Sequence, residues 1–278
     1  MLLSCVQSHV TFGDVADNFR RVLDWMVLCN SRDVDLVVMP ECTLTGYGFE
    51  SRDEAMEHAI TTDDARWEKL FSACQKKGRL YVVLGFLERV ETASGTKLYN
   101  SSALFGPGGI IATYHKVHLP HLGVDRFVDR GDQPYVTHQA GAAKVGLAIC
   151  YDCSFPEPMR VLALDKADVI ALPTNWPVAA SRTAEIVPPA RSMENHLYFV
   201  AANRVGTERG FTYCGLSSIC GPDGVELARA GDEETILFAE VDLAKARNKR
   251  IERTVGAHVI DRFAYRQPSF YGKIANEK

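Results

Sequence analysis

Short apolar runs of strand length alternate with stretches of helical periodicity along most of the 278 residues. In the stretch 14–28, for example, apolar residues recur at the spacing of one helix face. This alternation is typical of α/β layering. It predicts strands at 2–7, 35–39, 80–87, 99–105, 110–114, 143–149, 169–172, 198–202, 212–219, 225–229 and 235–241. It predicts helices at 14–28, 63–77, 155–166, 182–195 and 242–253, with Pro188-Pro189 interrupting the fourth or marking its start.

Similar short words occur in the same order in the two halves of the chain. DLVVMP at 35–40 is repeated as DVIALP at 168–173, and LYVV at 80–83 as LYFV at 197–200. Two serines precede GPGG at 106–109 and again GPDG at 221–224. Any two α/β halves can share such words by chance, but three in order favour two related units. We therefore predict one α/β domain of two stacked sheets between outer helix layers.

The composition excludes several classes of partner and location. The chain has 31 Lys and Arg against 35 Asp and Glu, a formal charge of −4, which provides no electrostatic footprint for nucleic acid or for an anionic membrane. No window approaches 18 consecutive apolar residues, so we expect no membrane span. The eight cysteines are scattered, and the start MLLSCVQSHV lacks a basic segment followed by a signal-like apolar run. These features predict a cytoplasmic protein with free thiols.

Three reactive residues follow predicted strands: Glu41, Lys116 and Cys150. Taken singly, each has an ordinary explanation, namely a cap or ion-pair partner, a solvated lysine and a core thiol. Taken together, they supply a base, a cation for a developing oxyanion and a nucleophile. The backbone N–H of Tyr151 is a second candidate donor to that oxyanion. This set suits attack on the carbon of an amide or a nitrile.

The motifs around these residues resemble those of the nitrilase superfamily of carbon–nitrogen hydrolases. The words are MPE at 39–41, YHKVHLP at 114–120, GLAICYDCSFPE at 146–157 and LPTNWP at 172–177, and the similarity extends over nearly the whole chain. The resemblance implies a four-layer αββα sandwich of two mixed sheets, assembled as dimers or larger oligomers. It also implies Glu41 as general base, Lys116 as oxyanion stabiliser and Cys150 as nucleophile. No metal or organic cofactor is implied.

The resemblance also leads to finer expectations. The family often carries a second acid after the lysine, and Asp125 is the nearest equivalent, one methylene shorter than glutamate. Ser154 stands where many relatives that act on carboxylate-bearing substrates have arginine, which leaves Arg182 or Arg204 as possible substitutes. We expect residues 1–254 to form the hydrolase domain and the aromatic and Arg-rich tail, 255–278, to pack at an oligomer interface.

Other candidates surround this predicted site. Tyr47 and Trp176 are predicted pocket walls, and Asn175 follows its strand as Glu41 follows the corresponding strand in the other half. His115, His118 and His121 have the spacing of a metal-ligand row on a helix, but Pro120 favours extended chain, so we expect no metal there. Cys150 and Cys153 form an isolated C-x2-C, and Cys153 is read as a lining or core thiol.

The leading hypothesis is an amidase that cleaves a small linear amide through a cysteine thioester and releases ammonia. An N-carbamoyl amidohydrolase, an ω-amidase and a nitrilase use the same residues, although nitrilases typically have Trp-Glu after the cysteine, where this chain has Tyr151-Asp152. A catalytically silent dimeric scaffold and a metal-binding regulator remain alternatives from other classes.

Overall fold

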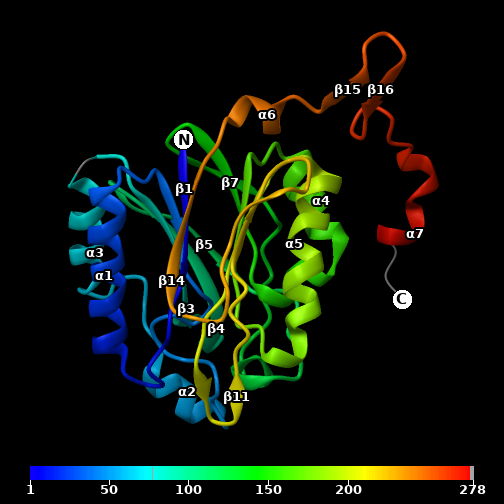
Figure 1. The fold of residues 1–278 in the computed structure, drawn as a ribbon. Helices are drawn as coiled ribbons and strands as arrows, with labels where there is room; N and C mark the ends of the chain where they lie inside the picture. The colour runs from blue at the N-terminus through cyan, green and yellow to red at the C-terminus, as the bar shows by residue number, and fades with distance from the viewer. Residues whose placement is uncertain (77, 276–278) are drawn as a thin grey trace.

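Two six-stranded sheets stack face to face in the computed structural model, which describes residues 1–76 and 78–275 (Figure 1). In the first sheet β1, β2 and β3 are parallel, and the strands at both edges run antiparallel to their neighbours. Its strands in spatial order are β14 (Thr235–Glu240), β1 (Leu2–Gln7), β2 (Leu36–Val38), β3 (Tyr81–Thr92), β4 (Gly95–Gly106) and β5 (Gly109–His115).

The second sheet repeats the pattern of the first. Its parallel centre is β7, β8 and β9, again with antiparallel strands on either side. This match confirms the predicted similarity of the two halves, although β14 crosses back to the first sheet. The spatial order is β13 (Glu226–Arg229), β12 (Ser218–Cys220), β9 (Tyr198–Ala202), β8 (Val169–Pro173), β7 (Ala143–Leu147) and β6 (Thr137–Ala140).

Helices cover the outer face of each sheet and complete the predicted αββα order (Figure 1). On one side α1 (Val15–Ser31) and α3 (Trp67–Gln75) bury residues such as Phe19 and Met26 against the first sheet. On the other side α4 (Pro156–Leu164) and α5 (Ser181–Asn195) pack on the second sheet. Apolar side chains such as Val38 fill the space between the sheets. Burying these apolar faces drives the layering.

Shorter elements connect or extend the layers. They are α2 (Arg52–His58), η1 (Gly123–Arg126), η2 (Cys150–Ser154), η3 (Val178–Ala180), β10 (Thr207–Glu208), β11 (Phe211–Thr212), α6 (Leu243–Arg247), β15 (Arg250–Thr254), β16 (His258–Asp261), η4 (Pro268–Phe270) and α7 (Gly272–Ala275). The sequence did not predict α2, nor strand β6 at the edge of the second sheet. The end of the predicted helix 63–77, at Lys77, lies outside the described residues.

The prediction that Pro188-Pro189 interrupts or starts a helix is wrong, because α5 runs through both prolines. A proline lacks the N–H that would bond to the carbonyl four residues earlier, here those of Ala184 and Glu185. The Arg229 side chain replaces these missing donors, with Nη2 at 3.4 Å from each of the two carbonyl oxygens. A long-range side chain therefore supports a helix that its own backbone cannot complete.

Two further predicted elements are also wrong. The stretch 212–219 is not one strand, because Leu216 adopts a left-handed backbone with φ 57° between β11 and β12. The charged helix expected at 242–253 ends at Arg247, and the chain continues as β15, which pairs with β16. The local helical signal of the charged residues is thus overridden by hairpin pairing.

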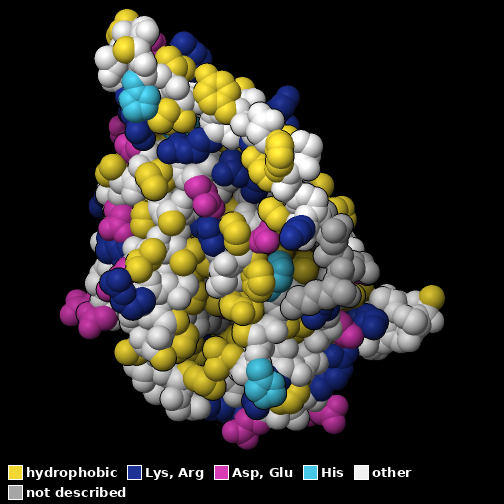
Figure 2. All heavy atoms as spheres, turned by 90° about the vertical axis from the view of Figure 1, so that its right-hand side faces the viewer, with side chains coloured by type: hydrophobic (Ala, Val, Ile, Leu, Met, Phe, Trp, Pro, Cys, Tyr) yellow, Lys and Arg dark blue, Asp and Glu magenta, His cyan; other side chains and the backbone are white. Residues whose placement is uncertain are grey.

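The described part of the tail, residues 255–275, extends along the outer side of α4 (Figure 1), and apolar side chains are exposed on this face of the molecule (Figure 2). A groove of about 830 Å³ separates the tail from α4, lined by Val161 and Leu164 on the helix and by Tyr265 and Ile274 on the tail. These four apolar side chains are all exposed. None of the helices in the described part of the chain is both long and apolar enough to cross a membrane.

Candidate active site

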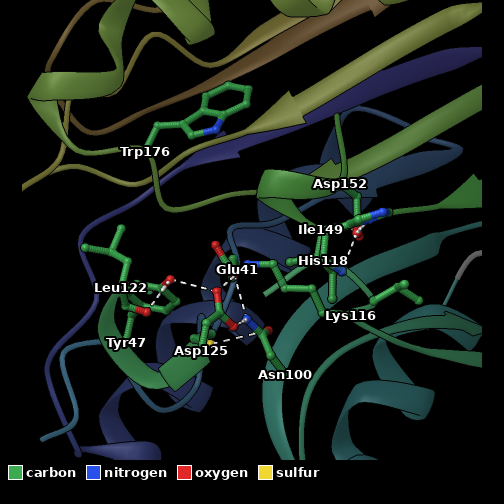
Figure 3. A network of polar contacts seen from close by, with 12 residues as sticks. Glu41, Tyr47, Asn100, Lys116, His118, Leu122, Asp125, Ile149, Asp152 and Trp176 are labelled. Carbon is green, nitrogen blue, oxygen red and sulfur yellow. Dashed lines mark hydrogen bonds and ion pairs between the residues drawn. The ribbon is translucent and has the colours of Figure 1, made fainter. Parts of the chain in front are cut away.

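Glu41, Lys116 and Asp125 meet in one buried cluster (Figure 3). The Lys116 ammonium donates to Glu41 Oε1 at 2.7 Å and to Asp125 Oδ2 at 2.5 Å. Asn100 Nδ2 also donates to both carboxylates, at 2.7 Å from the same Glu41 Oε1 and 2.8 Å from Asp125 Oδ1. The four side chains therefore fix one another, since each charged group has an oppositely charged or amide partner.

Strand ends and close backbone packing bring these residues together. Glu41 follows β2, and its backbone lies so close to β3 that a Cβ on Gly85 would be 2.7 Å from the Glu41 Cα. Lys116 follows β5, and its backbone N–H bonds to the carbonyl of Asn100 on β4 at 2.9 Å. Asp125 lies on η1, nine residues beyond the lysine. A residue larger than glycine at position 85 would push the Glu41 segment away from the sheet.

Cys150 stands at a sharp turn beyond β7, where η2 begins. Its φ of 45° is in the left-handed region, which is unusual for a residue with a side chain. Asp152 holds this turn: its Oδ2 accepts from the Ile149 N–H at 2.9 Å and from the Tyr114 hydroxyl at 2.7 Å. Its Oδ1 accepts from the backbone N–H of His118 at 3.1 Å. Asp152 thus ties the cysteine turn to the segment that follows Lys116.

Burial and charge set the protonation of the cluster. Burial raises the pKa of Glu41, and the neighbouring Asp125 adds to the rise, while Lys116 lowers it. Burial alone would lower the pKa of Lys116, but Asp125 and Glu41 together raise it well above its usual value. The lysine therefore stays an ammonium at neutral pH.

The Cys150 thiol is held in its neutral form. Burial raises its pKa well above the usual value and Glu41 raises it further, whereas Lys116, Thr174 and the backbone of Asn175 act in the opposite direction. A thiol in this state needs a base to accept its proton at the moment of attack.

Several buried polar atoms around the thiol lack a hydrogen-bond partner among the described residues. They include Glu41 Oε2 and both polar atoms of the Asn175 side chain. Asn175 is 2% exposed, and its backbone acts directly on the Cys150 thiol. Buried groups left unpaired cost free energy unless a ligand or water satisfies them. These atoms mark the place where a polar substrate group can bind.

The predicted wall residues differ in their surroundings. The Tyr47 ring lies 5.9 Å from the Lys116 ammonium, and its hydroxyl donates to Asp125 Oδ2 at 2.7 Å, so Tyr47 belongs to the charged cluster. Trp176 follows Asn175 and is fixed by its backbone N–H, which donates to Asn203 Oδ1 at 2.8 Å. Figure 3 shows its indole across Glu41 from Asp125. Tyr151 directly follows Cys150 on η2.

The remaining candidates have other partners. His115 pairs with Glu88 at 3.0 Å and His118 with Asp152 at 2.7 Å, while His121 is exposed. Across residues 1–76 and 78–275, no group of three or more metal-ligating side chains comes together. Arg204 is fully buried against Glu208, and Arg182 is exposed beside Glu185. Cys153 is a buried core residue.

Sequence reasoning missed Asn100 and Glu208. Asn100 lies on strand β4 beside two further polar residues, Ser101 and Ser102, so nothing in the local sequence distinguishes it. Glu208 lies in the second half of the chain but accepts hydrogen bonds from the backbone N–H groups of Tyr47 and Gly48 at 2.8 and 2.6 Å. A contact across 160 residues leaves no local pattern.

Comparison with known proteins gives a consistent result. The sequence model of the carbon–nitrogen hydrolase family matches residues 2–251. A nitrilase from Pyrococcus abyssi is 37% identical over 247 residues, which cover 88% of this chain and 91% of that protein. An (R)-stereoselective amidase from a Pseudomonas species is 34% identical and covers 90% of this chain and 88% of its own length.

A solved structure has the same fold. The NitN amidase from Nesterenkonia sp. AN1 superposes with a TM-score of 0.78, at 23% identity, over 99% of both chains. The match includes two mixed sheets with helices outside them, in agreement with the αββα sandwich expected from the sequence.

Proposed function

The chain belongs to the carbon–nitrogen hydrolase family, and from this membership we propose that it is an amidase that hydrolyses a small linear amide and releases ammonia. The observation that carries the proposal is the buried contact of Lys116 with both Glu41 and Asp125, at 2.7 and 2.5 Å, beside a neutral Cys150 thiol. A buried cation between two acids, next to a thiol, suits acyl transfer better than a structural ion pair.

In the first half-reaction Cys150 is the nucleophile. Glu41 Oε2, which has no partner among the described residues, accepts the thiol proton while sulfur bonds to the amide carbon. Lys116 gives two of its three N–H groups to Glu41 and Asp125, so the third donates to the oxyanion together with the Tyr151 backbone N–H. The C–N bond then breaks, the nitrogen takes the proton from Glu41, and ammonia leaves a thioester on Cys150.

In the second half-reaction water replaces ammonia. Glu41 accepts a proton as the water oxygen bonds to the thioester carbon, and the same two donors hold the oxyanion. The C–S bond breaks, the sulfur regains a proton from Glu41, and the carboxylic acid leaves. Amide and water are thereby converted to acid and ammonia, and no metal or organic cofactor takes part in the proposed steps.

The site also suggests how an amide is chosen. A primary amide both donates and accepts hydrogen bonds, which matches the unpaired Asn175 side chain and the free oxygen of Glu41. A nitrile nitrogen only accepts. We therefore propose a linear amide rather than a nitrile as the substrate. An N-carbamoyl compound and an ω-amide would be narrower substrate classes for the same reaction. Tyr47 and Trp176 are proposed to line the part of the pocket that holds the acyl group of the substrate.

Ammonia release from a panel of short aliphatic amides tests the proposal. The wild type is expected to release ammonia, whereas Cys150→Ala is expected to release none. Cys153→Ala is the matched control, because this buried thiol lies three residues away and has no assigned role. Equal release by the wild type and Cys150→Ala would contradict the proposal. Absence of turnover with an unreactive Cys150 thiol would favour a silent scaffold.

Assembly and location complete the proposal. We propose that residues 1–254 form the hydrolase domain and that 255–278 packs at the interface of a homodimer or larger homo-oligomer. The exposed apolar side chains of α4 and of the tail support this surface. The scattered, buried cysteines and the weak net charge favour a cytoplasmic enzyme with no nucleic-acid or membrane partner.

A further inference from the structure

We propose that Glu208 is a positioning residue for the reaction: held by Arg204, it fixes the segment of Tyr47, and through the Tyr47 hydroxyl it orients Asp125 and the Lys116 ammonium. The inference rests on the proposed amidase function. It assigns a part in catalysis to an ion pair that lies outside the charged cluster and belongs to the other half of the chain.

The first observation is the enclosure of the Glu208 carboxylate by the loop after Glu41. Oε1 accepts from the backbone N–H groups of Tyr47 and Gly48, at 2.8 and 2.6 Å. Gly46 has φ +82°, and a Cβ on it would lie 2.9 Å from Glu208 Oε2. The loop therefore closes around a carboxylate, and glycine at position 46 is what allows the close approach.

The second observation is how Glu208 itself is fixed. Arg204 Nη1 donates to Glu208 Oε2 at 2.7 Å, and Arg204 Nη2 donates to the Val10 carbonyl at 2.8 Å. The Arg204 guanidinium also stacks 4.3 Å from the Tyr213 ring centroid. Both charged side chains are almost completely buried. Removing two charges from water is costly, and this cost is offset only when the ion pair has good geometry and further hydrogen bonds. The contacts of Arg204 therefore hold the Glu208 carboxylate in one position.

The third observation is the short path from Glu208 to the charged cluster. The Tyr47 backbone bonds to Glu208, and its hydroxyl donates to Asp125 Oδ2 at 2.7 Å. The same Oδ2 accepts from Lys116 at 2.5 Å. The Tyr47 hydroxyl and the Lys116 ammonium therefore share one oxygen, and a shift of Tyr47 changes where Asp125 holds the lysine.

A loss of this support has a predictable consequence. If Lys116 moves away from Glu41, the base loses the cation that lowers its pKa. The pKa of Glu41 then rises. The acid limb of the pH profile, where kcat/KM falls as the pH is lowered, therefore moves to higher pH. A purely structural role for Glu208 would reduce stability but leave the pH profile of the folded fraction unchanged.

The test is Glu208→Gln, which keeps an oxygen for the two backbone N–H groups but removes the charge opposite Arg204. We expect kcat to fall about 10–100-fold, the size of effect that small misplacements of catalytic groups produce. KM should change little, and the acid limb should move to higher pH. Glu91→Gln is the matched control, because Glu91 is exposed at the end of β3 and pairs loosely with Arg89 at 3.9 Å.

A double-mutant cycle with Tyr47→Phe separates positioning from stability. If Glu208 acts through Tyr47, the double variant should lose about as much activity as the more affected single variant. The proposal would be overturned if the activity losses of the two single variants multiplied in the double variant. It would also be overturned if the pH profile of Glu208→Gln equalled that of the wild type. Should Glu208→Gln fold poorly, Glu208→Asp retains the charge and withdraws the carboxylate by one methylene, with the same expected shift in pH profile.

The pH dependence of Cys150 alkylation by iodoacetamide provides a second readout. It follows the protonation of the thiol and Glu41 without requiring turnover. If the wild type turns over no amide, the proposed function fails, yet a shifted alkylation profile in Glu208→Gln would still support the positioning role. If the wild type is active and both profiles of the variant are unchanged, only the positioning role fails.

Discussion

The Lys116 ammonium donates to Asp125 Oδ2 at 2.5 Å, nine residues along the chain, and both side chains are completely shielded from solvent. Asp125 shares this lysine with Glu41, so two buried carboxylates have one cation between them. Such an arrangement is unstable without the cation, because like charges in a low-dielectric interior repel each other strongly. The stability and the pH behaviour of the protein both depend on this contact.

Replacing the lysine should therefore destabilise the fold. In Lys116→Met the two carboxylates lose their common partner, and we expect a loss of about 3–5 kcal/mol in the free energy of unfolding. Lys97→Met is the matched control, since Lys97 forms a partly exposed pair with Asp129 and should contribute less than about 1 kcal/mol. Urea denaturation at neutral pH measures both. Equal losses in the two variants would contradict the account.

The pH profile of kcat/KM should reflect the environment of Glu41. Burial raises the pKa of this carboxyl, and only its deprotonated form accepts a proton from the thiol. Activity should therefore be present above that raised pKa and be lost as the pH falls through it, at a pH above the ordinary range of glutamate. Lys116, with a raised pKa, should not limit activity up to mildly alkaline pH.

Asp125→Asn tests the assignment of this acid limb. Removing the negative neighbour that helps to raise the pKa of Glu41 should move the limb to lower pH, even though kcat falls. An unchanged or higher limb in this variant would mean that another group controls it.

The charged cluster could be predicted only in part. Glu41, Lys116 and Cys150 stand at the ends of predicted strands, and the motif resemblance led to Asp125. The structure brings Glu41, Lys116 and Asp125 into direct contact. The Asn100 side chain that links the two acids was not predicted, because a polar residue followed by two serines in a strand does not reveal which of them faces the acids.

Arg229 should be needed for the integrity of α5. Its guanidinium lies 3.4 Å from the two carbonyl oxygens that Pro188 and Pro189 leave without backbone donors. Arg229→Met should cost about 1–3 kcal/mol, the usual penalty for leaving partly buried polar groups unpaired. Arg182→Met, on the exposed start of α5, is the control and should be near neutral. Thermal unfolding of the two variants measures the difference. Equal melting temperatures would contradict the role of Arg229 in stabilising α5.

The same contact explains why the interruption of α5 was predicted wrongly. Two adjacent prolines remove two helical hydrogen bonds, and local reasoning has no reason to expect their replacement. The compensating arginine lies on β13, about 40 residues further along the chain. The helix predicted at 242–253 failed for a related reason, since β15 depends on pairing with β16. Both errors concern contacts with residues outside the predicted helix: an arginine about 40 residues away for α5, and a neighbouring hairpin strand for β15.

The exposed apolar surface of α4 should mediate self-association. Leu164→Asp places a charge beside the groove between α4 and the tail, and we expect it to reduce the molar mass in solution to that of one chain. Val27→Asp is the matched control, because Val27 is also apolar and exposed but lies on α1, on the opposite side of the sandwich. Sedimentation velocity measures the mass. Loss of association in the control, or none in Leu164→Asp, would contradict the proposed interface.

In the proposed reaction Cys150 carries the acyl group of the substrate as a thioester. The most direct measurement is mass spectrometry of the protein quenched in acid during turnover of a short amide, with fragmentation to locate any adduct. We expect the added mass of the acyl group on Cys150, absent in Cys150→Ala and retained in Cys153→Ala. Continued ammonia release by Cys150→Ala, or an acyl adduct found on Cys153 instead, would contradict it.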